Sequence, residues 1–106
     1  MGDRGTIVVK EGPGTIYLYT HWGGSELKTT LRRALGREAR WDDPAYLTRI
    51  IFCEMVKGHE ADETGFGIST QPQDGEYNTL VVNTDSQTVT EGDGEAVPFR
   101  EFVVNE

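Results

Sequence analysis

The stretch Thr20-His21-Trp22-Gly23-Gly24 brings a titratable side chain, an aromatic ring and flexible backbone together within five residues. His21 can donate a hydrogen bond or transfer a proton near neutral pH, and Trp22 can stack on a flat ligand. If a helix starts just after the two glycines, its free N–H groups could hold an anion. The spacing of the glycines matches no phosphate-binding loop. A structural role, with Trp22 in the core and His21 hydrogen-bonded at its rim, stays open beside a ligand-binding role.

A small-ligand or enzymatic pocket built on this turn would also use the aromatic side chains of Tyr19 and Trp41. Elsewhere, His59 opens an acidic loop, but its spacing to the carboxylates matches neither a zinc motif nor an EF-hand. Cys53 lies in the most apolar segment of the chain, so we expect a buried and unreactive packing residue. No nucleophile elbow or Ser-His-Asp order is present. We therefore predict no catalytic residue, no metal site and no cofactor.

Glu54 interrupts an apolar run. It either points to solvent beside Arg49 and Lys57 or is buried, and a buried carboxylate would need a partner such as an arginine.

The elements around the turn can be predicted from residue patterns. Thr6 to Lys10 and Thr15 to Trp22 are rich in β-forming residues and flank a glycine-containing loop, which predicts a β-hairpin. Alternation places Ile16, Leu18, Thr20 and Trp22 on a core face, and Tyr17, Tyr19 and His21 on the other, partly exposed or covered by the following helices.

Two helices should follow the hairpin. Ser25 can cap a helix that starts at Glu26 and that Gly36 ends. Asp43 as N-cap and Pro44 at the first position give the strongest helix start in the chain, for a mostly buried helix that ends at Gly58.

The last third of the chain predicts strands. Three segments have this pattern: 65–71, 77–84 and 87–91. Pro98 to Val104 fits a short helix or a strand, and we favour the helix. The order β-β-α-α-β-β-β predicts an α+β fold, with an antiparallel sheet, two helices packed on one face and a possible short C-terminal helix. At 106 residues we expect a single domain, 1–106.

Charge is distributed unevenly along the chain. Residues 1–57 hold nine basic and seven acidic side chains, whereas residues 58–106 hold one basic and eleven acidic, within a net charge of −8. This asymmetry either serves solubility or forms a negative face that docks on a basic partner, and we place such a partner surface at Glu91, Asp93 and Glu95. Direct binding to nucleic acid is disfavoured because phosphate neutralisation dominates such binding.

No apolar run reaches the length of a membrane helix, so we expect no membrane partner. The single cysteine, Cys53, excludes an internal disulfide and fits the reducing cytoplasm.

Four blocks of the sequence, covering about half of it, resemble a recurrent family of small bacterial and phage-type proteins that has no assigned activity. The blocks are Ile16 to Gly24 (IYLYTHWGG), Arg40 to Met55 (RWDDPAYLTRIIFCEM), Glu63 to Thr70 (ETGFGIST) and Val81 to Thr90 (VVNTDSQTVT). The resemblance carries no catalytic residue. It implies a free-standing domain on a viral or mobile genome, a setting that favours small non-enzymatic inhibitors of host machinery.

From these observations we predict a non-enzymatic binding module that acts through a protein surface. The alternative is the nucleotide-like ligand or enzymatic pocket around His21, Trp22 and Trp41.

Overall fold

The chain begins with the predicted hairpin. The structure, a computed structural model, describes residues 4–20, 26–71, 79–92 and 94–104. Strand β1 (Gly5–Glu11) pairs antiparallel with β2 (Gly14–Thr20), and Ile7 lies opposite Leu18. Gly12 turns the chain with a φ of 55°, and its N–H donates to Asp85 Oδ2 at 2.7 Å, which ties the hairpin tip to a turn far along the sequence.

Two helices follow, joined by a short connection. Helix α1 (Leu27–Gly36) ends at the predicted glycine; its predicted cap, Ser25, lies outside the described residues. Helix α2 (Pro44–Met55) starts as predicted, because the Asp43 side chain accepts a hydrogen bond from the backbone of the first turn.

The remaining strands complete one six-stranded sheet with the order β3-β2-β1-β4-β5-β6. Strand β4 lies beside β1 and runs parallel to it, while every other pairing is antiparallel. The predicted α+β fold and the C-terminal helix are confirmed, and the sheet is mixed rather than wholly antiparallel. The elements after α2 are β3 (Phe66–Ser69), β4 (Thr79–Asn83), β5 (Thr88–Glu91), β6 (Val97–Pro98) and α3 (Phe99–Val104).

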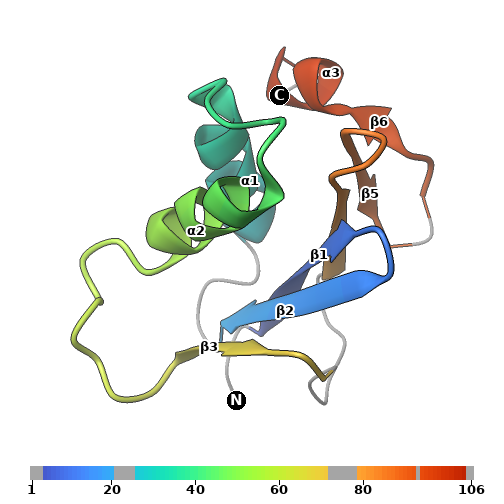
Figure 1. Cartoon of the computed structure of the whole chain (residues 1–106). Helices are drawn as coiled ribbons and strands as arrows, with labels where there is room; N and C mark the ends of the chain where they lie inside the picture. Colours follow the sequence, from blue (N-terminus) through green and yellow to red (C-terminus); the bar gives the residue numbers. More distant parts are fainter. Residues whose placement is uncertain (1–3, 21–25, 72–78, 93, 105–106) are drawn as a thin grey trace.

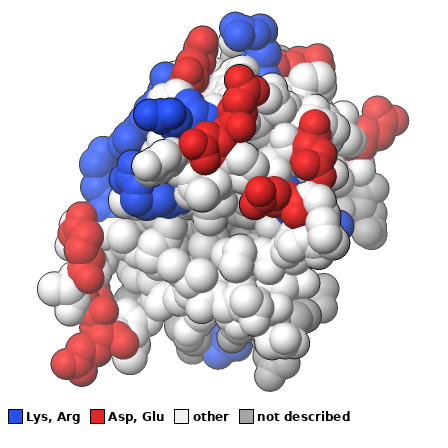
Figure 2. Space-filling view, in the orientation of Figure 1, with Lys and Arg blue, Asp and Glu red and all other residues white. Residues whose placement is uncertain are grey.

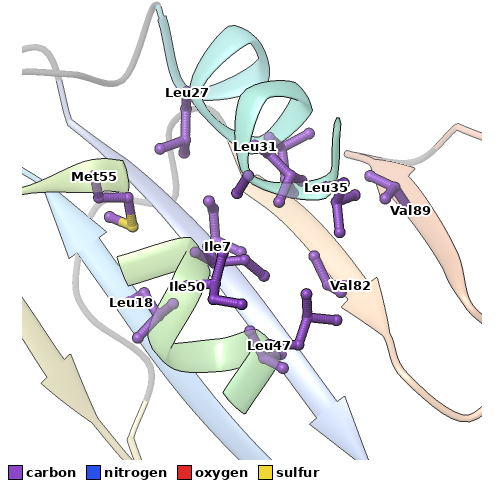
Figure 3. Close-up of a cluster of buried hydrophobic side chains, with 14 of the residues drawn as sticks. Ile7, Leu18, Leu27, Leu31, Leu35, Leu47, Ile50, Met55, Val82 and Val89 are labelled. Atoms are coloured by element: carbon purple, nitrogen blue, oxygen red, sulfur yellow. The ribbon is translucent and has the colours of Figure 1, made fainter. Parts of the chain in front are cut away.

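The helices lie together on one side of the sheet, and the core fills the space between the two layers (Figure 1). Leucines of α1 and α2 meet alternate residues of the strands, among them Ile7, Leu18 and Val82, all fully buried (Figure 3). The alternation of strand side chains makes this possible, because every second residue of each strand points to the helices. Helix α3 adds Phe99 and Phe102 to the same core.

Within the described residues, no helix is long and apolar enough to cross a membrane.

Candidate functional site

The end of β2 leads into the predicted ligand-binding turn, and the structure describes only the part of this turn that belongs to β2. Tyr19 and Thr20 are described, whereas His21, Trp22, Gly23 and Gly24 lie outside the described residues. Thr20 is 1% exposed and lies on the core face of the sheet, as predicted from alternation. Tyr19, the next side chain back, points to the opposite face.

A hollow of about 480 Å³ lies beside Thr20, where the end of β2, the start of α1, the end of α2 and the start of β3 meet. Its lining mixes apolar, charged and hydroxyl side chains: Thr20, Glu26, Leu27, Thr30, Arg33, Glu54, Met55, Lys57, His59 and Phe66. No buried side-chain nitrogen or oxygen among the described residues lacks a hydrogen-bond partner. The described part of the wall therefore holds no buried polar side-chain atom that a ligand would have to satisfy.

Glu54 is the most deeply placed charge in this hollow. Its side chain is only 5% exposed, and its two oxygens take different partners: Arg37 Nη2 donates to Oε2 at 2.8 Å, and Lys57 Nζ lies 3.6 Å from Oε1. Of the two alternatives predicted for Glu54, solvent exposure or burial beside an arginine, the structure has the second. Helical periodicity explains it, because residue 54 follows Leu47 and Ile51 on the buried stripe of α2.

Tyr19 and Trp41 lie on opposite sides of the sheet. The Tyr19 ring covers Gly67 of β3, so closely that an added Cβ there would overlap it. Trp41 packs against the core on the helix side. The structure does not bring these two aromatic residues of the predicted pocket together.

Trp41 is held by contacts on several sides. Its Nε1 donates to the Leu35 carbonyl at 3.1 Å, its ring meets Phe99 edge-on at 5.4 Å, and the Arg100 guanidinium lies 5.5 Å from the ring centre. A shallow hollow of about 610 Å³ beside it is lined mainly by charged and amide side chains: Glu38, Arg40, Trp41, Asp42, Asp43, Gln87 and Arg100. With its indole N–H donated and its ring packed against Phe99 and Arg100, Trp41 is a packing residue at the rim of the core.

The predicted acidic surface lies at the end of β5. Glu91 pairs with Lys28 of α1 at 3.0 Å, and both side chains are well exposed. Glu95 lines a hollow of about 280 Å³ together with Glu91, Lys28 and Arg32, over an apolar floor. Asp93 lies outside the described residues. The described part of this surface therefore mixes acidic and basic groups.

The remaining candidates for chemistry have local roles. His59 Nδ1 lies 3.0 Å from Asp62 Oδ2, and its ring lies against Phe66. The described residues contain no group of three His, Cys, Asp or Glu side chains that could hold a metal ion. The expectation of a buried Cys53 is wrong: this residue is exposed, with Arg49 Nη1 3.7 Å from its Sγ. The apolar run misled the prediction, because Cys53 lies two residues past Ile51 and so about 200° around the helix from the buried stripe.

The sequence left open whether the second face of the sheet is partly exposed or covered by the helices. We call this second face the open face. No described helix packs on it, because all three contribute to the core on the other side. Its described strand residues include no acidic residue: Thr6, Val8, Lys10, Thr15, Tyr17, Tyr19, Gly67, Ser69, Thr79, Val81, Asn83, Thr88, Thr90 and Pro98. In the sequence, Tyr17 and Tyr19 alternate with core residues along one strand, and this alternation indicated that the sheet has a second face.

Cross-strand pairs assemble the centre of the open face. Val8 lies directly between Tyr17 on β2 and Val81 on β4, and Thr6 pairs with Tyr19. Val8 and Thr6 are largely buried, while Tyr17 and Val81 are half-buried. The centre is therefore a band of apolar, aromatic and threonine side chains. In Figure 2, by comparison, Lys and Arg gather over the side of α1 and α2, and the surface over β2 and β3 in the lower part is almost free of charge.

No family model matches this chain, and no match to it is found among curated proteins or solved structures. The resemblance to small bacterial and phage-type proteins accordingly stays a prediction.

Proposed function

We propose that this protein is a non-enzymatic binding module that acts through a protein surface, and that the open face is this surface. The observation that carries the proposal is the absence of acidic side chains from the described open face of a chain with 18 Asp and Glu residues. The centres of protein interfaces are depleted in charge and enriched in tyrosine. Tyr17, Tyr19, Val8 and Val81 have this composition and lie side by side.

The open face supports the proposal better than the acidic residues near the end of β5 do. Glu91 already has a basic partner within the chain, and Lys28 and Arg32 lie in the same hollow as Glu95. A docking partner would have to compete with Lys28 for Glu91. We retain Glu91, Asp93 and Glu95 as a second contact region, where their charge would speed the encounter with a basic partner more than it would hold the complex.

The proposed setting is cytoplasmic, in line with the single cysteine and the resemblance to phage-type proteins. The partner would be a protein, such as a component of host machinery, rather than a nucleic acid or a membrane.

A small-ligand site is the second candidate, and the hollow beside Thr20 favours it. Its volume of about 480 Å³ lies within the range of ligand pockets. The described side chains that would contact a ligand are Arg33, His59 and Lys57, rather than Trp41. A thermal-shift screen of nucleotides, sugars and metal ions tests it: a ligand that raises the Tm, and fails to do so in Arg33→Ala, supports this candidate.

The leading proposal is tested by affinity capture with the full chain as bait. Tyr17→Lys places a charge in the centre of the open face, and it should reduce recovery of a specific partner by about tenfold or more, because central aromatic residues dominate interface energy. Tyr46→Lys makes the same substitution at a tyrosine of α2, which is 50% exposed and lies on the other side of the sheet, and it should leave recovery unchanged.

Thermal unfolding of each variant separates lost binding from lost folding. If Tyr17→Lys is unstable, Tyr17→Thr keeps a strand-forming residue and serves as a second variant. Recovery that is equal for the wild type, Tyr17→Lys and Tyr17→Thr would refute the open face as the binding surface.

A further inference from the structure

The two outer strands of the sheet are protected very differently. On one edge, β6 has only two residues; the second is Pro98, which has no N–H to offer, and α3 follows at once. On the other edge, β3 contains no proline and no charged residue, and in the described part of the chain no strand pairs with its outer side. Proteins normally blunt an exposed edge with proline, lysine or a covering element, because free N–H and C=O groups invite another strand.

β3 also exposes a large apolar side chain. Ile68 is 59% exposed, although its direct partner on β2, Leu18, is completely buried. Both side chains point to the helix side of the sheet, but the helix layer does not extend over Ile68. A strand added beside β3 would place its own side chains against Ile68 and remove it from water.

The exposed loop just before β3 is acidic. In this loop, Glu60 and Glu63 have no ion-pair partner among the described residues, and Asp62 contacts only His59. Between His59 and Phe66 the sequence contains three acidic residues and no lysine or arginine. A second copy of the chain would bring two such segments together, which like-charge repulsion opposes. A basic segment would be attracted to the same place.

We infer that the edge of β3 binds an extended, basic segment of another protein as an added strand. This inference rests on the proposed function and names the chemistry of the partner. The backbone of β3 supplies hydrogen bonds, Ile68 supplies an apolar contact, and the acidic loop selects lysine and arginine over acidic side chains. The added strand would also widen the open face, because Gly67 and Ser69 of β3 lie on that face beside Tyr19 and Tyr17.

The test starts with a random peptide library selected against the full-length protein. The selected peptides should be basic and rich in β-branched residues. On isotope-labelled protein, the best peptide should shift the backbone amides of Phe66–Ser69 and slow their hydrogen exchange. Acidic or charge-neutral selected peptides, the absence of any enriched peptide, or shifts confined to other elements would overturn the inference.

Variants and modified peptides then separate backbone pairing from simple charge attraction. N-methylation of alternate peptide amides removes strand pairing without changing charge, and it should abolish binding. Ile68→Lys should weaken peptide binding by about tenfold, since it removes the apolar contact and adds a like charge. Tyr46→Lys adds the same charge on α2 and should have no effect. Glu60→Gln combined with Glu63→Gln should weaken binding and reduce its dependence on salt. Full binding by the N-methylated peptide, or by Ile68→Lys, would overturn strand addition.

The two proposals can fail separately. If partner capture depends on Tyr17 but no basic peptide binds at β3, the open face stands and strand addition falls. If peptides bind at β3 but Tyr17→Lys captures its partner normally, the edge rather than the open face is the contact surface.

Discussion

The Arg37–Glu54 and Lys28–Glu91 ion pairs differ mainly in the burial of the carboxylate. Their N···O distances are 2.8 and 3.0 Å, and both cationic side chains are 47% exposed. Glu54 is 5% exposed, however, and Glu91 is 62% exposed. The two ion pairs can therefore be compared to measure how burial changes the coupling energy between two charges.

The expected magnitudes follow from these exposures. An exposed pair contributes about 0–1 kcal/mol, so Lys28→Ala should change the free energy of unfolding by less than about 0.5 kcal/mol. Removing one partner of a fully buried pair costs about 3–5 kcal/mol. Because Arg37 is half-exposed and Lys57 stays near the other oxygen of Glu54, we expect Arg37→Ala to cost roughly 2 kcal/mol, below that range. For a chain of this size, that corresponds to a decrease in Tm of roughly 8 °C.

Urea unfolding of two double-mutant cycles measures the difference. One cycle combines Arg37→Ala with Glu54→Gln, and the other combines Lys28→Ala with Glu91→Gln. The first should give a coupling energy of about 1 kcal/mol or more and the second less than about 0.5 kcal/mol. High salt should reduce the second coupling more than the first, because buried charges are screened less. Equal coupling energies in the two cycles would refute the reasoning from burial.

Three further substitutions test the packing described above. Gly67→Ala should lower the free energy of unfolding in urea by about 1–3 kcal/mol, because the new Cβ overlaps the Tyr19 ring. In a Tyr19→Ala background this loss should be smaller. An undiminished loss would exclude this contact as the cause. Trp41→Phe should lower the free energy of unfolding by about 1–2 kcal/mol, because the Leu35 carbonyl loses its indole donor. The same variant should still capture the partner. Lost capture with unchanged stability would instead make Trp41 a binding residue. Asp43→Ala should lower the free energy of unfolding by about 0.5–1 kcal/mol, because the Asp43 side chain caps α2. Asp43→Asn should keep most of this stability. Equal losses for the two variants would exclude capping as the cause.

Local chemistry made much of the fold predictable. The start of α2 depends on Asp43 and Pro44, which act within one turn of the chain, and the hairpin depends on neighbouring strand residues and a glycine turn. Such interactions join residues close in sequence, so pattern and spacing reveal them. The choice of helix for the C-terminal segment was correct for the same reason, since Pro98 immediately precedes α3.

The predicted site depended on contacts between distant residues, and there the sequence was less informative. Trp41 and Tyr19 belong to one candidate pocket by residue type, yet the sheet lies between them. The apolar run around Cys53 suggested burial, but the rotation of α2 turned that thiol outward and Glu54 inward. A run of residue types reports the average character of a helix, whereas orientation against the sheet decides each side chain.

The sequence by itself therefore determined the helices, the first five strands, the order of these elements and the excess of acidic residues in the second half, because each follows from residue types and short-range spacing. Only the tertiary structure decided that β4 joins β1 in parallel, that β6 adds a sixth strand, and that β3 lies at an edge of the sheet. These features arise when the burial of apolar side chains brings distant strands together, and residue spacing along the chain does not record that arrangement.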